Sequence, residues 1–332
     1  MELNSRVFVT GANSLLATNT IVELLSQGFK VLGLLRNIEK YIGPKHKNLS
    51  LIEGDILNDY DLDKALIDCQ YAIHIASLTD QNRLNYSDYE VVNVFGAKKV
   101  ITACVRNNIK KIVYISTANV FGYGNLTNLG NEEMSIKKPF VSSYYAQSKF
   151  QAQKEILNYS DVIETIIVNP TFMIGPYDAK PSSGKIIVMG MKNKVVFCPP
   201  GGKNFVSVTD VSRGVIKALI NGKNKEAYIL ANENLTYKEF FIKLRKQVQN
   251  KFLIIQLPKT LLLTLGYFGN ILRSFGIQTD ISNTNMKILC VNNYYSNEKS
   301  VNKLEMQYEP IDMSVSKALK WFDNFSLINK AK

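Results

Sequence analysis

Short apolar runs alternate with longer amphipathic stretches over the first half of the chain. The runs are four or five residues long and rich in Val and Ile, as expected of parallel strands that are buried on both faces. They fall at residues 7–10, 31–35, 49–52, 72–75, 112–115 and 165–168. Between them, the spacing of apolar positions predicts helices at 15–27, 88–107 and 144–157. The alternation predicts an α/β fold in which crossover helices join the strands into a doubly wound parallel sheet over residues 1–170.

The alternation becomes looser after Pro170. Segments that Gly and Pro interrupt follow, such as Gly175-Pro176. We expect a smaller, mainly substrate-binding region over residues 171–332, with parts of 205–230 returning to the main sheet.

Two helices are predicted within this second region. Thr236 and Glu239 have the spacing of a capping box, which opens a helix. Pro258 suits the first position of another helix, whose apolar face we expect to cover the core or a pocket. That face consists of Leu261, Leu265, Phe268, Leu272 and Phe275.

Composition narrows the class of protein. The chain has 332 residues, of which 46% are hydrophobic, enough for a large buried core. Its four cysteines are far apart and form no CxxC pair, so we expect neither a disulfide framework nor a metal site. The net charge of +12 comes from scattered lysines, without the clustered basic and aromatic residues of a nucleic-acid groove. We therefore expect a small-molecule partner and no nucleic acid.

The first residues and the longest apolar stretch indicate where in the cell we expect the protein. Residues 1–6 lead straight into an apolar run and lack the basic start and cleavage site of a secretion signal. The longest apolar stretch, 252–275, is interrupted by Pro258, Lys259 and Arg273, and falls short of the roughly 20 apolar residues that a membrane span needs. We expect a cytoplasmic protein with no membrane span.

The first predicted strand passes directly into a helix through Thr10-Gly11-Ala12-Asn13-Ser14-Leu15-Leu16-Ala17. Backbone N–H groups and the positive end of the helix dipole at such a junction can bind a pyrophosphate, as in Rossmann-type folds. One glycine of the G-x-x-G-x-x-G fingerprint is kept, and small residues stand at the other two places. An ordinary strand-to-helix turn is the alternative interpretation. On the first interpretation, a dinucleotide contacts Gly11, Asn13, Ser14, Leu15 and Leu16.

Arg36 follows the second predicted strand. An enzyme that binds NAD usually has Asp or Glu at this place, on the ribose 2′-hydroxyl. A guanidinium instead matches a 2′-phosphate, although a single Arg at a strand end can also be simply solvated. Arg36 favours NADP(H), with NAD(H) as the alternative cofactor.

One of four Tyr-x-x-x-Lys pairs lies in a predicted helix between the fifth and sixth strands. Tyr145 and Lys149 are i and i+4 on that helix, which puts them on one face. A phenol ordinarily has a pKa near 10, and a nearby ammonium lowers it towards neutrality. Thr117, just after the fifth strand, can position a carbonyl oxygen. These residues suit reduction of a carbonyl, with Tyr145 as proton donor and Lys149 as its partner.

Motifs along nearly the whole chain resemble the extended short-chain dehydrogenase/reductase family, part of the NAD-dependent epimerase/dehydratase superfamily. Besides Gly11, Arg36 and the Tyr145/Lys149 pair, the similar segments are Gly54-Asp55-Ile56, His74-Ile75-Ala76-Ser77, Asn93 with Gly96, Ser116-Thr117-Ala118-Asn119-Val120-Phe121-Gly122, Asn169-Pro170 with Gly175-Pro176, the stretch from Gly202 through Asp210-Val211, and Tyr295 to Pro310. Within the family, the chain looks closest to dihydroflavonol reductase-like and hydroxysteroid dehydrogenase-like members.

The resemblance implies further site residues. It gives Asp55 a contact with adenine, Thr117 the catalytic hydroxyl position, and the stretch after Asn169 a place beside the nicotinamide. The remaining cofactor contacts that it implies are Ile56, Ala76, Ser77, Asn93, Ser116, Tyr145, Lys149, Pro170 and Met173. Family members are often homodimers that pair the helices corresponding to residues 88–107 and 144–157.

Three functions remain open on the sequence. The leading hypothesis is an NADP(H)-dependent oxidoreductase that reduces a ketone or aldehyde or oxidises the alcohol. A nucleotide-sugar epimerase with tightly held NAD is the second, and Arg36 speaks against it. A protein that binds NADP(H) as a sensor or scaffold without catalysis is the third, suggested by the altered glycine loop. A sugar 4,6-dehydratase would carry Asp-Glu after Thr117, where Ala118 and Asn119 stand instead.

Overall fold

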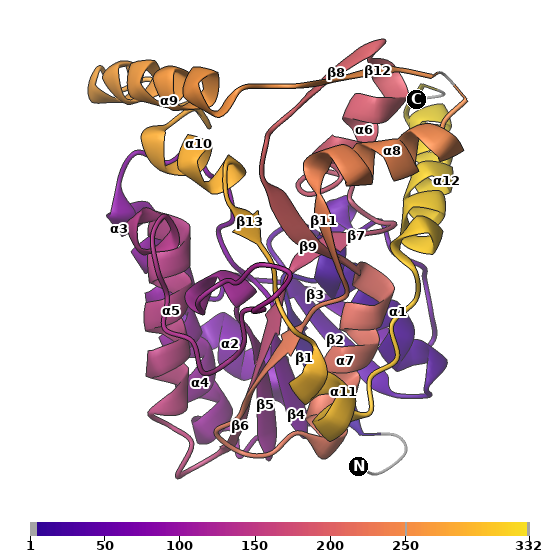
Figure 1. Cartoon of the computed structure of the whole chain (residues 1–332). Helices are drawn as coiled ribbons and strands as arrows, with labels where there is room; N and C mark the ends of the chain where they lie inside the picture. The colour runs from indigo at the N-terminus through magenta and orange to yellow at the C-terminus, as the bar shows by residue number, and fades with distance from the viewer. Residues whose placement is uncertain (1–4, 250, 331–332) are drawn as a thin grey trace.

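Seven parallel strands form the main sheet of the computed structural model, which describes residues 5–249 and 251–330. Their order is β10-β6-β5-β4-β1-β2-β3 (Figure 1). The strands are β1 Arg6–Thr10, β2 Lys30–Leu35, β3 Leu49–Glu53, β4 Tyr71–His74, β5 Lys111–Ile115, β6 Glu164–Pro170 and β10 Ala227–Leu230. The first six overlap the six predicted runs, and β10 pairs with β6 at one edge. The predicted doubly wound α/β fold is confirmed.

Helices cover both faces of this sheet (Figure 1). Alternation along β1 explains the two cores, because Val7 and Val9 point into one and Phe8 into the other. On the first face lie α1 (Leu15–Ser26) and α7 (Val208–Asn221). On the second lie α2 (Asp59–Leu66), α4 (Gly96–Arg106) and α5 (Tyr144–Leu157).

The helix predicted at 88–107 is composite. It begins as α3 (Tyr86–Tyr89), continues as a π-helical segment over Glu90–Phe95, and then becomes α4. A π turn contains one more residue than an α turn and is frequent at functional sites. Here it turns Asn93 into the interior, where its side chain is 1% exposed.

The second region is built around β9 (Gly202–Ser207). Antiparallel β11 (Glu233–Thr236) pairs with it on one side, and parallel β7 (Phe172–Ile174) and β13 (Asn292–Asn293) pair with it as well. The helices α6 (Lys185–Lys192), α8 (Tyr237–Gln247) and α12 (Ile311–Lys330) share a third apolar core with this sheet. The capping box predicted at Thr236 and Glu239 is confirmed at the start of α8.

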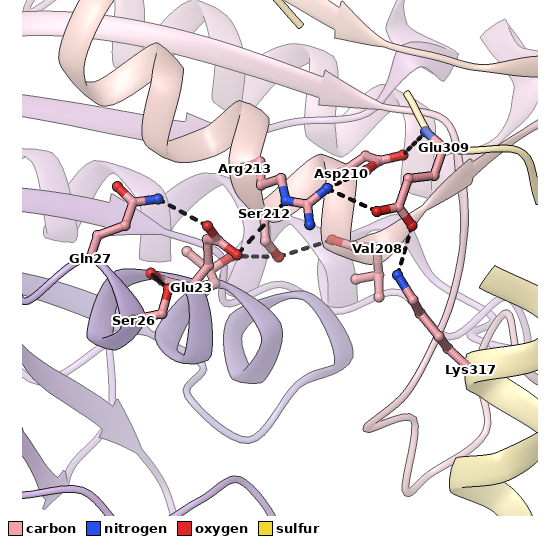
Figure 2. Close-up of polar contacts among 10 residues, drawn as sticks. Glu23, Ser26, Gln27, Val208, Asp210, Ser212, Arg213, Glu309 and Lys317 are labelled. Carbon is pink, nitrogen blue, oxygen red and sulfur yellow. Dashed lines mark hydrogen bonds and ion pairs between the residues drawn. The ribbon is translucent and has the colours of Figure 1, made fainter. Parts of the chain in front are cut away.

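A polar cluster ties the C-terminal segment to the helices of the main sheet, as Figure 2 shows. Arg213 on α7 forms ion pairs with Asp210 (3.3 Å) and Glu309 (3.2 Å) and approaches Glu23 of α1 at 4.0 Å. Glu309 also pairs with Lys317 of α12 at 2.7 Å. Asp210 is fully buried, and its other oxygen accepts a hydrogen bond from the backbone N–H of Glu309. The cluster therefore fixes the second region against α7.

The helix after Pro258 corrects one expectation. Pro258 is the N-cap, and α9 spans Lys259–Ser274. Its apolar face covers neither the core nor a pocket: the five residues predicted to pack are 39–78% exposed. The buried side is Leu262 with two glycines, where a Cβ on Gly266 would come within 3.0 Å of Asn283 on α10 (Asn283–Leu289). The helix can pack closely on α10 only through the side that carries the glycines. Its large apolar residues therefore face outward. Within the described residues, no helix is long and apolar enough to cross a membrane.

Candidate active site

Thr10, the last residue of β1, links the carboxyl end of β1 to the carboxyl end of β4. Its hydroxyl oxygen accepts hydrogen bonds from the backbone N–H groups of Ile75 and Ala76, both at 3.0 Å, and lies 2.8 Å from Nδ1 of His74. His74 is buried, and burial together with the charge of Lys149 lowers the pKa of its imidazole to about 3. The imidazole is therefore neutral. Neither Thr10 nor His74 was predicted as a site residue, and only their place at strand ends could have indicated it.

The position after Thr10 requires a glycine, which is Gly11. Its φ is +68°, and a Cβ would come within 3.0 Å of the Cα of Ala76. The chain then enters α1, where the Ser14 hydroxyl accepts from the N–H of Ala17 as an N-cap. Because Gly11 has no side chain, the backbone at the N-terminus of α1 lies directly against the loop that follows β4. That geometry fits a pyrophosphate.

Arg36 and Asp55 lie at the carboxyl ends of β2 and β3, next to Gly11 at the end of β1. Arg36 is exposed, while Asp55 is partly buried and accepts a hydrogen bond from the N–H of Leu57 at 2.9 Å. Beside Arg36, the buried Oδ1 of Asn37 has no hydrogen-bond partner among the described residues. A buried acceptor without a partner is costly unless a ligand supplies the donor. These features fit the adenosine end of a dinucleotide.

Several predicted cofactor contacts are core residues. Their apolar side chains are at most 9% exposed and pack inside the two cores, so only their main-chain atoms are available to a cofactor. They are Leu15, Leu16 and Ile56. Pro170 is buried within β6, and Met173 packs against the core beneath α1 and α7. Asn13 and Ser77 are partly exposed at the loops that flank Gly11 and Ala76.

Asn93 holds the loop after β4 against α5. Its Oδ1 accepts from the N–H of Leu78 at 2.7 Å, and its Nδ2 donates to the carbonyl of Leu78 and to the hydroxyl of Ser148. Ser148 lies between Tyr145 and Lys149 on α5. The side chain of Asn93 therefore positions the loop and the helix of the candidate active site.

Tyr145 lies in the first turn of α5, which begins after the N-cap Ser143. The side chain of Thr117, at the end of β5, interacts with the phenol and favours its ionised form. Asn169 donates to the carbonyl oxygen of Thr117 at 3.0 Å and to Gln153 of α5, which holds the two elements together. Next to Thr117, the buried hydroxyl of Ser116 has no partner among the described residues. The structure thus brings the predicted Thr117 and Tyr145 together.

Lys149 is 2% exposed, one turn after Tyr145. Its ammonium donates to the carbonyl of Ile115 at 2.6 Å and lies 4.3 Å from the centre of the Tyr114 ring. Burial lowers the pKa of this lysine to about 7, because the charged form is disfavoured away from water. Its proton is thus exchangeable near neutral pH.

Lys149 was expected to lower the pKa of Tyr145, but burial has the largest effect on the phenol. Burial raises the pKa of the phenol to about 12, and the interaction with Thr117 offsets this only in part. The reason is that Lys149 is directed towards the carbonyl of Ile115 and is itself desolvated. At neutral pH Tyr145 is therefore a protonated phenol, ready to donate.

A pocket adjoins Thr117 on the side of the second region. Its walls come from the end of β5, from β7, from β9 and from the segment around β13. The lining residues are Thr117, Asn119, Thr171, Phe172, Lys203, Asn204, Asn293 and Tyr295. Lys203 is the charged residue among them. The sequence places residues 202–210 in a family motif but assigns Lys203 no role, since no spacing rule shows that it lines a pocket with Thr117.

Comparison with known proteins identifies the family. The model of the NAD dependent epimerase/dehydratase family matches residues 7–231. A putative dihydroflavonol 4-reductase of Synechocystis sp. is 27% identical over 331 residues, 97% of this chain and 95% of that protein. A 2-alkyl-3-oxoalkanoate reductase of Shewanella oneidensis is 30% identical over 213 residues, 58% and 53% of the two chains. The solved structure of gox2253 superposes with a TM-score of 0.82 at 23% identity and covers 97% of this chain and 98% of its own.

The family match spans the main sheet from β1 to the end of β10. It includes the glycine turn, the Thr117 segment and the Tyr145/Lys149 helix that the structure brings to one edge of the sheet. The chain therefore belongs to the NAD dependent epimerase/dehydratase family, the extended short-chain dehydrogenases/reductases, whose members bind a nicotinamide dinucleotide.

Proposed function

We propose that this protein is an NADP(H)-dependent oxidoreductase that interconverts a ketone or aldehyde and its alcohol. The observation that carries the proposal is the interaction between the side chains of Thr117 and Tyr145, with a pocket at Thr117 and a buried lysine one helical turn after Tyr145. The reductase names of the two curated relatives support reduction over epimerisation.

The cofactor is held along the carboxyl ends of β1, β2 and β3. Gly11 and the N-terminus of α1 would hold the pyrophosphate, Arg36 the 2′-phosphate, and Asp55 the adenine. The bound nicotinamide supplies or accepts hydride. The Ser116 hydroxyl and the Asn37 amide oxygen, both without a partner among the described residues, are polar atoms that such a ligand would satisfy.

The chain's own part in the reaction is proton transfer. Thr117 donates to or accepts from the substrate oxygen and so fixes it beside the phenol. Tyr145, with its pKa raised to about 12, keeps its proton at neutral pH and gives it to the oxygen as negative charge develops there. Lys149, with its pKa near 7, takes up or releases a proton at working pH, and its charge stabilises the phenolate that remains.

The test is Tyr145→Phe, which removes one hydroxyl. We expect NADPH affinity within about twofold of wild type and turnover lower by at least 10²-fold, the scale of a general acid. Tyr144→Phe is the matched control, because Tyr144 is the neighbouring tyrosine on α5 and its side chain is exposed. Full turnover by the Tyr145 variant in an NADPH oxidation assay with a carbonyl panel would refute the proposal.

The cofactor preference has its own test. Arg36→Gln should weaken NADPH binding about 10-fold or more and leave NADH binding unchanged, since the guanidinium would contact the 2′-phosphate alone. Titration of both cofactors by nicotinamide fluorescence measures this. Equal losses for NADPH and NADH would show that Arg36 acts on the fold and not on the phosphate.

A nucleotide-sugar epimerase is distinguished by what copurifies. Such an enzyme retains NAD through its cycle, whereas a reductase exchanges cofactor at every turnover. Mass spectrometry of the purified, denatured protein should therefore show no stoichiometric NAD. One NAD per chain, with no preference for NADPH, would favour the epimerase.

A further inference from the structure

The pocket beside Thr117 holds one cation and no anion among the residues that line it. Lys203 lies on β9, and its ammonium is 4.9 Å from the centre of the Phe172 ring. Burial lowers the pKa of this lysine to about 8, with no charged group of the described residues contributing to the shift. The aromatic face attracts the ammonium, but a desolvated ammonium without a carboxylate is unfavourable, and a bound anion would relieve this.

Other polar atoms of the same pocket are also without partners. The hydroxyl of Tyr295 has none among the described residues, although the side chain is 1% exposed. Oδ1 of Asn293 has none either, while its Nδ2 donates to Asn119 at 3.1 Å. The residues that line the pocket thus supply an ammonium and a hydroxyl as donors and an amide oxygen as an acceptor, and Thr117 lines the same pocket.

We propose that Lys203 and Tyr295 bind the carboxylate of the substrate, which makes the substrate an oxo acid or the corresponding hydroxy acid. This rests on the proposed function, because it places the reacting carbonyl at Thr117 and Tyr145. A carboxylate carries the single charge that one lysine can balance. A diphosphate would bring further negative charge into a pocket whose lining holds no second cation.

The test measures binding without turnover. Octanoate and octanamide are titrated into the NADP⁺-saturated protein by calorimetry at pH 7; they share a tail and differ in charge. Octanoate should bind at least 10-fold more tightly, and its affinity should fall as the pH rises through and above 8, where Lys203 loses its proton. Lys203→Met should abolish the preference, Lys203→Arg should retain it, and the exposed Lys194→Met is the matched control.

Two outcomes would overturn the assignment. One is equal binding of octanoate and octanamide to the wild type, or a preference that survives in Lys203→Met. The other is tighter binding of inorganic pyrophosphate than of octanoate, lost in Lys203→Met, which would make the ligand a phosphate. Neither readout uses carbonyl reduction. These titrations can therefore refute the carboxylate site without refuting the proposed function, which the Tyr145→Phe variant tests.

A second, independent observation concerns the end of the molecule formed by β8 (Val195–Cys198), β12 (Leu253–Gln256) and α9, which Figure 1 shows at the top. Val195 pairs with Leu253 and Phe197 with Ile255, so these four exposed side chains share one face of a two-stranded sheet. The segment from α9 to residue 281 adds further exposed apolar side chains. They are Leu261, Leu265, Tyr267, Phe268, Ile271, Leu272, Phe275, Ile277 and Ile281. We call this set the apical surface.

Positive charge borders the segments that form the apical surface. Exposed lysines flank both strands and both ends of the α9–α10 pair: Lys192, Lys194, Lys251, Lys259 and Lys287. Over residues 251–287 the acidic residue is Asp280, which lies 3.8 Å from Lys185. Exposed apolar side chains gathered at one end of a protein mark an interaction site, and apolar side chains with a basic border suit the headgroup region of an anionic bilayer.

We propose that the apical surface binds anionic phospholipid membranes peripherally, with the apolar face of α9 in the headgroup region. The helix has 16 residues and lies across the end of the protein, which suits insertion in the membrane plane. Membrane contact would remove the exposed rings of Phe268 and Phe275 from water.

Vesicle cosedimentation tests this surface. The wild type should bind vesicles of phosphatidylglycerol and phosphatidylcholine at least 10-fold more strongly than phosphatidylcholine alone, and 0.5 M NaCl should weaken binding. Phe268→Ser with Phe275→Ser should reduce binding about 10-fold, whereas Tyr60→Ser, an exposed aromatic residue on α2, should not. No binding to anionic vesicles, or unchanged binding by the double variant, would refute the proposal. A dimer in light scattering that the double variant dissociates, without vesicle binding, would assign the surface to a second copy.

Discussion

Replacing Lys149 with methionine should stabilise the protein at neutral pH while abolishing activity. The side chain is 2% exposed, and burial lowers its pKa from 10.5 to about 7. At about 1.4 kcal/mol per pKa unit, keeping this lysine in the fold costs roughly 4 kcal/mol at pH 7. Methionine removes that term but leaves the carbonyl of Ile115 without its donor, which costs about 1–3 kcal/mol. The net gain should be about 1–3 kcal/mol.

The sign of the pH dependence follows from the proton balance. Between pH 7 and 10.5 the unfolded chain binds a proton at this lysine that the folded protein does not. The contribution of Lys149 to the free energy of unfolding of the wild type therefore rises with pH. The advantage of Lys149→Met should therefore shrink by roughly 2 kcal/mol from pH 7 to pH 9. Other titrating groups are shared by both proteins and cancel in the difference.

Urea unfolding at pH 7, 8 and 9 measures this. The single tryptophan, Trp321, stacks on Phe325 and contacts Tyr177, so its fluorescence reports loss of packing around α12. Lys154→Met, at an exposed position on the same helix, is the control and should differ from wild type by a constant amount. A constant difference between wild type and Lys149→Met across this range would refute the reasoning.

Two further substitutions probe the positions that frame the site. Gly11→Ala should weaken NADPH binding at least 10-fold in a fluorescence titration, because its Cβ would meet Ala76 at 3.0 Å; Gly28→Ala has a similar positive φ with nothing within 4 Å and should bind NADPH normally. Asn93→Ala should lower unfolding stability by about 1–3 kcal/mol and reduce kcat, because the N–H and carbonyl of Leu78 lose their partner. Wild-type stability in urea would show that Asn93 is dispensable for holding the loop.

Much of the fold is visible in the sequence because it depends on local pattern. Short runs of apolar and β-branched residues predict strands, and parallel strands need crossover helices. The capping box at Thr236 is equally local, since its hydrogen bonds join residues three apart. The π segment at Glu90–Phe95 was not predicted, because its helical periodicity differs little from that of the flanking turns.

The apolar face of α9 shows where local pattern is insufficient. Its spacing predicts a buried stripe, yet the helix packs on α10 through its glycine side. Periodicity shows that one face is apolar, but what covers that face is decided by the neighbouring elements. Lys203 is a comparable case: its charge is plain in the sequence, while the pocket that it lines is formed by four segments far apart in the chain.

The sequence by itself determined the order of strands and helices, the glycine turn at Gly11 and the i, i+4 pairing of Tyr145 with Lys149, because each depends on residues close together in the chain. Only the tertiary structure decided the pKa values of the Tyr145 phenol and the Lys149 ammonium. Burial raises the pKa of Tyr145 and lowers that of Lys149, the reverse of what a solvated pair would show for the phenol. The reason is that desolvation depends on every atom packed around a group, and those atoms come from strands and loops that the chain brings together only when it is folded.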